Sequence, residues 1–335
     1  MRPTMKDVAK HAAVSTATVS NVIRNTKYVS DPVKNRILAS MKELGYEPNI
    51  IARSLKMNKT FKIGVVVPDI TNPFFSEIVK EVEVFLEKEG YQLILCNSHY
   101  QVERENLICS SFISGGGIDA LILVAPRLSS EKLMKIIKGV PVVIVDRPSF
   151  SDDENLVFIF SDNYSGASLV ADKLVSKNYD KFACIAGPEM VPNANARLQG
   201  FVDRLADKKV ERDSIIVSRA EFTFDHGFSE MEKILERTNR EERLGVFVCS
   251  DIAAWGALEA VKLQGLRIPE DVGIIGYDDI SFAKYLHPGL TTIKNPMIEM
   301  GKLSATFVLD LLRGDASISC NSIVLGSSLV ERGTV

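Results

Sequence analysis

Residues 4–25, TMKDVAKHAAVSTATVSNVIRN, predict two short helices joined by a tight turn. Thr4 and Asp7 stand three residues apart, which is the spacing of a helix-capping box. Small apolar residues follow as one narrow stripe that ends at Ala12. We therefore expect the first helix to begin just after Thr4 and to bury that stripe.

A second helix is predicted to begin after Ser15, a residue that caps helices well. Val14 precedes this cap and Val19 occupies the fourth helical position, a spacing at which two apolar side chains pack across a helix start. Val22 and Ile23 continue the inward stripe. The opposite face carries side chains that are small or polar: Thr16, Ala17, Ser20, Asn21 and Arg24.

A third helix completes one small all-α unit, since Ser30 can cap it, Pro32 falls in its first turn and Gly45 stops it. Residues 1–60 contain eleven Lys and Arg against four Asp and Glu, so this segment carries about +7 while the whole chain carries −3. A basic helix pair whose second member exposes short polar side chains matches a helix-turn-helix that reads the major groove of DNA. A solvated surface helix is the alternative, and the helix pattern by itself favours neither.

Two long motifs resemble the amino-terminal domain of the LacI/GalR family of bacterial transcription regulators. They are residues 4–25 and residues 43–55, ELGYEPNIIARSL. The resemblance implies a helix-turn-helix DNA-binding domain over residues 1–47, followed by a hinge helix and linker over residues 48–60. The DNA contacts that it implies are Thr4, Ser15, Thr16, Ala17, Thr18, Ser20, Asn21, Asn25, Tyr28, Asn49, Ala52, Arg53, Leu55 and Lys56.

The chain departs from the family pattern at two positions, one of these DNA contacts and one residue of the turn. Asn21 stands where Arg is usual, so the bases or phosphates read there should differ. Ala13 stands where Gly is frequent, and a left-handed backbone at Ala would cost on the order of 1 kcal/mol. In the hinge, the resemblance assigns Leu55 to a wedge in the minor groove, while a plain basic linker is the alternative.

From Lys62 onward, short β-rich runs alternate with longer amphipathic stretches. Residues 73–89, for example, predict a helix that Gly90 stops. Such βαβ series predict an α/β core of two doubly wound lobes, and ligands in such folds bind at the carboxyl ends of the strands. The strands expected from their β-branched content are residues 62–68, 91–97, 119–125, 141–146, 182–187, 245–250 and 272–278.

Polar and aromatic residues collect at the predicted strand ends, and aromatic rings with hydroxyl-binding side chains suit a sugar. Residues from about 62 to 332 resemble the periplasmic-binding-protein-like core of the same family, which implies a two-lobed effector-binding and dimerisation core over residues 61–335. By position in its motifs, the resemblance implies these effector contacts: Asn72, Phe74, Phe75, Asp146, Arg147, Arg197, Phe222, Ser250, Tyr277, Asp278 and Asn295.

Several of these residues, and Asp251 beside Ser250, also have ordinary structural interpretations. Phe74 or Phe75 can be helix core, Asp146 and Arg147 can form an ion pair, and Asp251 can cap the helix that follows it. Ser250 replaces an Asn that is common in the family. Arg197 is expected to begin a helix, RLQGF, in the second lobe.

The sequence indicates a cytoplasmic homodimer that is not an enzyme and holds no cofactor or metal. Its five cysteines stand singly, without a C-x-x-C pair, and its four histidines lack metal-ligand spacing. No apolar run is long enough for a membrane span. Gly115–Gly117 follow a helical stretch, so a nucleotide-binding loop is not supported. The predicted partners are pseudo-palindromic operator DNA, on which the protein represses transcription, and a sugar or sugar derivative. A sugar-binding transport receptor and an α/β sugar enzyme are the alternatives.

Overall fold

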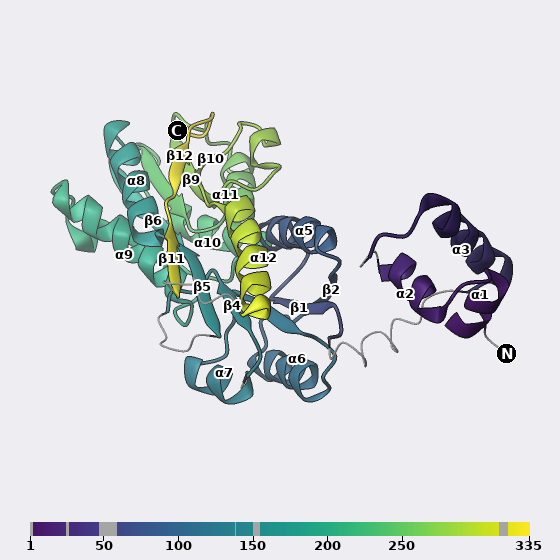
Figure 1. Cartoon of the computed structure of the whole chain (residues 1–335). Helices are drawn as coiled ribbons and strands as arrows, with labels where there is room; N and C mark the ends of the chain where they lie inside the picture. Colours follow the sequence, from purple (N-terminus) through teal and green to yellow (C-terminus); the bar gives the residue numbers. More distant parts are fainter. Residues whose placement is uncertain (1–2, 25–26, 47–58, 138, 150–154, 315–320) are drawn as a thin grey trace. The chain divides into compact units, whose positions relative to one another are not determined.

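The structure is a computed structural model of the chain that describes residues 3–24, 27–46, 59–137, 139–149, 155–314 and 321–335 (Figure 1). The chain divides into two compact units, Met1–Thr60 and Phe61–Val335, each with its own hydrophobic core. Within the described residues, every helix is too short or too polar to cross a lipid bilayer.

The first unit begins with the capping box that the sequence predicts. The backbone N–H of Asp7 donates to Thr4 Oγ1 at 3.4 Å, and the N–H of Thr4 donates to Asp7 Oδ2 at 2.8 Å. These two bonds satisfy donors that a helix start otherwise leaves unpaired. The described helices of this unit are α1 (Met5–His11), α2 (Thr16–Arg24) and α3 (Asp31–Leu44).

Ser15 caps α2 as predicted, because the N–H of Thr18 donates to Ser15 Oγ at 3.0 Å. Ser30 occupies the cap position of α3, but its side chain makes no capping hydrogen bond, so the prediction was right in position and wrong in mechanism. Pro32 in the first turn has no N–H to be capped and fixes its own φ, which starts the helix without that bond. Gly45 ends α3 with a left-handed φ of 62°.

Three apolar residues from the three helices, Val8, Val19 and Ile37, are fully buried at the centre of the first unit. The turn between α1 and α2 contains Ala13, which is exposed and has a φ of 50°. The left-handed conformation considered for Ala13 is therefore present. Val14 packs at the edge of the same core, as expected for a residue that precedes a helix cap.

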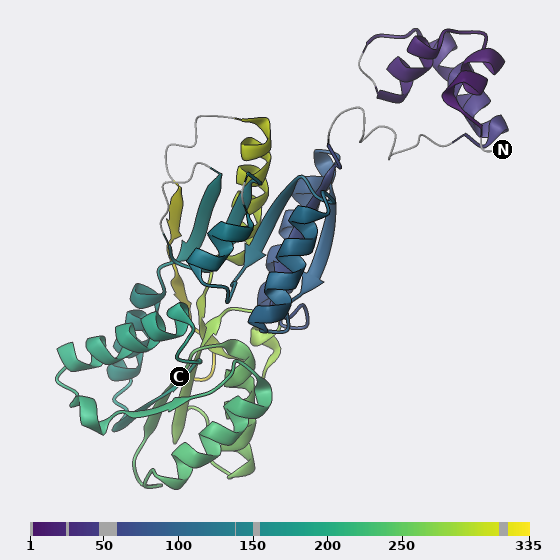
Figure 2. The ribbon, with the colours of Figure 1, turned by 90° about the horizontal axis from the view of Figure 1, so that it is seen from below.

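The second unit contains two six-stranded sheets, one in each lobe (Figures 1 and 2). The sheet of lobe 1 has the order β11-β5-β4-β3-β1-β2 with every neighbouring pair parallel, and the sheet of lobe 2 has the order β12-β10-β9-β8-β6-β7 with only β12 antiparallel. The strands of lobe 1 are β1 (Lys62–Val67), β2 (Gln92–Asn97), β3 (Ala120–Val124), β4 (Val142–Val145), β5 (Leu156–Ser161) and β11 (Ser322–Leu325). Those of lobe 2 are β6 (Lys181–Ala186), β7 (Ile216–Arg219), β8 (Leu244–Val248), β9 (Val272–Asp278), β10 (Thr291–Lys294) and β12 (Ser328–Val330).

Helices cover both faces of each sheet, which is why central strands such as β3 and β8 are apolar and buried along their whole length. Lobe 1 carries α5 (Pro73–Lys88), α6 (Val102–Ser114), α7 (Ser130–Ile136) and α12 (Met297–Arg313). Lobe 2 carries α8 (Asn163–Ser176), α9 (Pro192–Asp207), α10 (Phe224–Glu236) and α11 (Asp251–Leu263), with short 3₁₀ turns η1 (Arg212–Ser214) and η2 (Ala283–Tyr285).

The two lobes lie end to end and exchange the chain three times within the described residues (Figure 2). The crossings run from β5 to α8, from β10 to α12 and from β11 to β12. All seven strands that the sequence predicts are present, each with its bounds within two residues of the expectation. Arg197 lies in the middle of α9, which begins at Pro192, so the expectation that Arg197 begins a helix was wrong. Proline at the first helical position starts that helix five residues earlier.

Candidate functional site

A cavity of about 120 Å³ lies between the two lobes, where residues that follow strands β1, β3 and β4 meet Ser250 after β8, Asp278 at the end of β9 and residues of α9. This is the carboxyl edge of both sheets, as the doubly wound topology predicts. The residues lining it are Pro68, Asn72, Phe74, Phe75, Tyr100, Ala125, Pro126, Arg127, Asp146, Arg147, Met190, Val191, Pro192, Asn193, Arg197, Phe222, Ser250 and Asp278.

Arg197 is the central cation of the cavity and is almost fully buried. Its Nε donates to Asn163 Oδ1 and its Nη1 donates to the carbonyl oxygen of Cys249, both at 2.7 Å, while its Nη2 lies 3.6 Å from Asp278 Oδ1. Its guanidinium group also stacks on the Tyr277 ring, 3.7 Å from the ring centre. These contacts fix the guanidinium in one orientation.

Two carboxylates face this arginine from different lobes. Asp146 follows β4 with a left-handed φ of 56°, and Asn193 Nδ2 donates to both its carbonyl oxygen and its Oδ1 at 2.8 Å. Burial raises the pKa of Asp146 to about 7, with Arg197 and Asn193 lowering it and Asp278 raising it. Burial likewise raises the pKa of Asp278 to about 6, against the lowering effect of Arg197.

Aromatic rings form the apolar wall of the cavity. The Phe74 and Phe75 rings meet edge to face with centres 5.1 Å apart, and the Tyr100 ring lies 6.4 Å beyond Phe75. Both phenylalanines are also nearly buried in the core of lobe 1, so the core and the cavity interpretations hold together. Phe222 is held close to the backbone, because a Cβ at Gly187 would lie 2.1 Å from Phe222 Cζ.

Three polar contacts join the lobes around the cavity. Arg127 Nη2 lies 3.2 Å from Glu221 Oε2, and the Arg127 guanidinium covers the Tyr100 ring at 4.8 Å. The N–H of Ser281 donates to Glu77 Oε1 at 3.0 Å. The third contact is the amide-to-carboxylate pair formed by Asn193 and Asp146. The lobes are thus bridged by polar groups that solvent or a ligand can replace.

The first unit presents a different kind of surface on α2. Thr16 and Ala17 are exposed, Thr18, Ser20 and Asn21 are partly exposed, and the preceding cap holds the helix start rigid. Tyr28 is 92% exposed, and it lines a surface depression together with Asn21, Val22, Lys27, Val29, Asp31 and Lys34.

Comparison with known proteins places these features in one family. Residues 4–49 match the lacI family of bacterial regulatory proteins, and residues 171–335 match the periplasmic binding protein-like domain. The chain is 34% identical over 331 residues to the HTH-type transcriptional repressor CytR of Escherichia coli (strain K12), covering 99% of this chain and 96% of that protein. The chain belongs to the lacI family of bacterial regulatory proteins.

Solved structures agree with this membership. The Lac repressor dimer bound to operator and the anti-inducer ONPF superposes with a TM-score of 0.85 at 26% identity, covering 100% of this chain and 99% of the repressor chain. A LacI family transcriptional regulator from Enterococcus faecium with bound ribose gives a TM-score of 0.73 at 29% identity, covering 82% of this chain and 98% of the regulator chain. This lacI-family chain is therefore a DNA-binding transcriptional repressor with a helix-turn-helix unit and a two-lobed core. The transport-receptor alternative is excluded by the match over residues 4–49.

Most of the effector contacts expected from sequence come together at the cavity of this lacI-family chain, and two do not. Tyr277 is fully buried beneath Arg197, and Asn295 donates from Nδ2 to Asp278 Oδ1 at 3.4 Å from outside the cavity. Both residues position the cavity side chains without lining the space, because the residues they contact stand between them and the cavity. The nine expected residues that do line it are Asn72, Phe74, Phe75, Asp146, Arg147, Arg197, Phe222, Ser250 and Asp278.

Two structural interpretations from sequence also need correction. Asp251 does not cap α11: Ser250 does, with the N–H of Ala253 donating to Ser250 Oγ at 3.3 Å. Asp251 instead turns inward and accepts from Thr292 Oγ1 at 2.6 Å. Asp146 and Arg147 form no ion pair in the described structure, since Arg147 Nη1 donates to the carbonyl oxygens of Pro126 and Leu128.

Sequence reasoning missed several cavity residues. Arg127 and Tyr100 each lie three residues after a strand, β3 and β2 respectively, so the strand-end signal used for Asp146 could have found both. Asn193 gave no such signal, because it lies inside α9. The expected DNA contacts in the hinge, together with Asn25, lie outside the described residues: Asn25, Asn49, Ala52, Arg53, Leu55 and Lys56.

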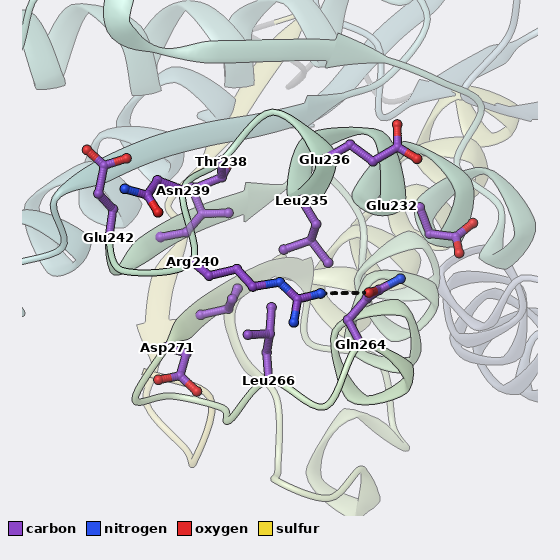
Figure 3. A pocket seen from close by; sticks show the side chains of 12 residues that line it. Glu232, Leu235, Glu236, Thr238, Asn239, Arg240, Glu242, Gln264, Leu266 and Asp271 are labelled. Atoms are coloured by element: carbon purple, nitrogen blue, oxygen red, sulfur yellow. Dashed lines mark hydrogen bonds between the residues drawn. The ribbon is translucent and has the colours of Figure 1, made fainter.

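A second depression in lobe 2 lies at the opposite edge of the sheet, beside the first residues of β8 and β9 (Figure 3). Arg240 crosses it and donates from Nη2 to Gln264 Oε1 at 3.2 Å. One acidic side chain of this depression already has a partner, because Asp271 forms an ion pair with Arg267. Among the described residues, no group of three or more His, Cys, Asp or Glu side chains is arranged to hold a metal ion.

Proposed function

We propose that α2 is the base-reading helix of this repressor, with Thr16, Ala17 and Asn21 directed to base edges in the major groove. The observation that carries this proposal is the exposed, short-chained face of α2, which is held on the buried Val19 and fixed at its start by Ser15. Short side chains let a helix enter the groove deeply, while the basic residues around it neutralise phosphates.

The remaining DNA contacts are assigned by the same reasoning. Thr4 and Ser15 use their hydroxyls in capping, so they act chiefly by placing backbone and neighbouring groups at phosphates. Tyr28, with its exposed ring, and the partly exposed Thr18 and Ser20 border the same surface. Residues 48–60 are proposed as the hinge that couples the DNA-binding unit to the core, with Leu55 as the minor-groove wedge.

The cavity between the lobes is proposed as the effector site, and its ligand as a sugar or sugar derivative. Aromatic walls beside buried, oriented polar groups suit a ring with hydroxyls, and a relative with the same fold has been solved with bound ribose. Binding there would change how the lobes meet, because Arg127, Glu221, Asn193 and Asp146 bridge them. A coupling free energy of roughly 1–3 kcal/mol changes operator affinity about 5- to 150-fold.

We further propose that the protein acts as a homodimer on a pseudo-palindromic operator, as the Lac repressor does in its operator complex. Trp255 and Tyr285 leave apolar ring surface exposed on lobe 2, and the Phe282 ring lies 5.7 Å from the Trp255 ring. The relatives are repressors, so we assign regulation and no catalytic activity to the chain, and we place it in the cytoplasm, where its operator would be.

Selection of bound sequences from a random DNA pool tests the assignment of α2. Asn21→Arg should change the bases selected, because Arg reads guanine where Asn reads adenine. Asn35→Arg, at an exposed position of α3, adds the same charge to the same unit and is the matched control. It should strengthen binding at low salt while leaving the selected sequence unchanged. The proposal fails if Asn21→Arg selects the same operator as the parent protein.

A further inference from the structure

Each of the three crossings between the lobes places one side chain against the same small group of lobe 2 residues. This group, the Arg197 cluster, consists of Arg197, Tyr277 and Asp278, all of which are at most 5% exposed. The Arg197 guanidinium stacks on the Tyr277 ring at 3.7 Å and lies 3.6 Å from Asp278 Oδ1. Because these side chains touch one another in a packed interior, a movement of Arg197 changes the surroundings of the other two.

Asn163 connects the first crossing to this cluster. It is the first residue of α8 and is 4% exposed. Its Oδ1 accepts from Arg197 Nε at 2.7 Å, and its Nδ2 donates at 3.1 Å to the carbonyl oxygen of Ser161, the last residue of β5. Since β5 belongs to the sheet of lobe 1, one amide side chain bonds to both lobes. A change in the backbone of this crossing therefore moves Arg197 or breaks one of the two bonds.

Asn295 connects the second crossing to the cluster through Asp278. It follows β10 and is 1% exposed. Its backbone N–H donates to the Asp278 carbonyl oxygen at 3.2 Å, and its Nδ2 donates to Asp278 Oδ1 at 3.4 Å. Asp278 has a φ of 120°, a conformation that a residue with a side chain rarely adopts. The second crossing thus holds a strained residue whose carboxylate faces Arg197.

Ser327 connects the third crossing to the cluster through Tyr277. It lies between β11 and β12, and it lowers the pKa of Tyr277, which burial raises to about 12. A Cβ at Gly166 would lie 2.6 Å from the Tyr277 hydroxyl oxygen and 3.3 Å from Ser327 Cβ. Gly166 stands three residues after Asn163, so the first and third crossings meet at the Tyr277 hydroxyl.

We propose that Asn163, Asn295 and Ser327 are positioning residues that couple the three crossings to Arg197, so that a ligand that moves Arg197 changes all three crossings together. Arg197 and Asp278 line the cavity, whereas the three positioning residues do not. The regulatory meaning of the coupling rests on the proposed effector function of the cavity. The coupling itself is a property of the ligand-free protein, so its test needs no effector.

Hydrogen exchange measured by mass spectrometry on the ligand-free, full-length protein tests the coupling. Asn163→Ala removes the bond to Arg197. Peptides from the second and third crossings, residues 289–298 and 321–331, should then exchange on the order of 10-fold faster, as for the loss of one hydrogen bond to a charged group. Peptides from α10, which packs on the opposite face of the lobe 2 sheet from α8, should be unchanged. Faster exchange at the first crossing alone, or equally fast exchange in α10, would overturn the proposal.

A conservative variant and a matched control separate coupling from local damage. Asn163→Asp keeps an acceptor for Arg197 Nε but loses the donor to Ser161, so the second and third crossings should regain their protection. Ser165→Ala, at an exposed position two residues further along α8, should leave all three crossings unchanged. If Asn163→Asp accelerates exchange as much as Asn163→Ala, the coupling does not pass through Arg197.

Tyr277→Phe tests the same link from the third crossing and serves where Asn163→Ala does not fold. It keeps the ring on which Arg197 stacks and removes only the hydroxyl beside Ser327. Exchange should become faster at the first crossing, residues 156–166, as well as at the third. Because residues of one network are not additive, Asn163→Ala combined with Tyr277→Phe should accelerate exchange by less than the product of the two single effects. Effects that simply multiply would contradict a shared cluster.

A panel of sugars relates the coupling to the proposed effector function. D-ribose, D-xylose, D-glucose and D-galactose are added separately to the parent protein, and a sugar that binds should alter exchange at all three crossings. Binding without any change at the crossings would overturn the regulatory role of the Arg197 cluster. Failure of every sugar to bind would count against the proposed class of effector, while the coupling would stand or fall on the ligand-free variants.

Discussion

Replacing Ala13 by glycine should stabilise the amino-terminal unit, although the substitution removes a methyl group. Ala13 is exposed and has a φ of 50°, a left-handed conformation that costs an L-residue with a Cβ roughly 1–2 kcal/mol. Glycine also gives the unfolded chain more conformational entropy, which reduces the stabilisation by about 0.4–1 kcal/mol. The difference predicts a net stabilisation of about 0.5–1 kcal/mol.

The neighbouring residue provides a control with the opposite sign. Ala12 is fully buried and has an ordinary helical φ of −77°. Ala12→Gly therefore loses about 0.8 kcal/mol of methyl burial in addition to the backbone penalty of roughly 0.5–1 kcal/mol. The same chemical change should thus stabilise at one position and destabilise at the next.

Hydrogen exchange measured by mass spectrometry reports the local stability of this unit in the full-length protein. For peptides from α1 and α3, Ala13→Gly should slow exchange by about 2- to 5-fold, the factor that corresponds to 0.5–1 kcal/mol. Ala12→Gly should accelerate exchange of the same peptides. Equal or faster exchange in Ala13→Gly would refute the assignment of strain to the turn.

Three further predictions concern the core. Gly256→Ala should destabilise the core by about 1–3 kcal/mol in thermal unfolding, because the new Cβ would lie 2.0 Å from the Phe224 carbonyl oxygen. Unchanged stability would show that α10 and α11 can move apart. Asp146 binds a proton in the folded protein up to about pH 7 but loses it near pH 4 when unfolded, so core stability should fall as pH rises through this window. Asp146→Asn should flatten that fall, and an unchanged pH profile would contradict the raised pKa. Glu221→Gln should lower the stability of the core by less than about 1 kcal/mol, since the ion pair of Glu221 with Arg127 is partly exposed. Because this pair bridges the lobes, its loss should speed sugar release in stopped-flow measurements, and an unchanged release rate argues against this role.

Local patterns were sufficient where a structure depends on neighbours in the chain. The Thr4 and Asp7 capping box, the Ser15 cap and the Gly45 stop are all formed by residues within a few positions of one another. Most central strands were predictable because burial on both faces requires continuous apolar runs, as in β3, but β5 was missed although it is buried along its whole length. Short edge strands such as β7 and β12 were not predicted, since they are partly exposed and lack that signature.

The cavity was predictable at strand ends and unpredictable elsewhere. Asp146 and Asp278 follow strands, and parallel topology brings such positions to one edge. Whether Tyr277, the residue before Asp278, faces the cavity or the core depends on side-chain direction, which alternates along a strand. Asn193 enters through the packing of α9 against the other lobe's loop, a contact between residues far apart in sequence.

The late return of the chain to lobe 1 has a consequence for how the protein is made. Most of lobe 1 is synthesised by Ser161, but α12 is added only after the body of lobe 2, and it packs so closely on α5 that a Cβ at Gly301 would lie 2.7 Å from the Ile78 carbonyl oxygen (Figure 1). At about 5–20 residues per second, the ribosome leaves the apolar face of α5 uncovered for on the order of 10 seconds. During that interval the nascent lobe exposes apolar surface that favours aggregation, while the amino-terminal unit, whose helices all lie within the first 60 residues, can fold as soon as it emerges.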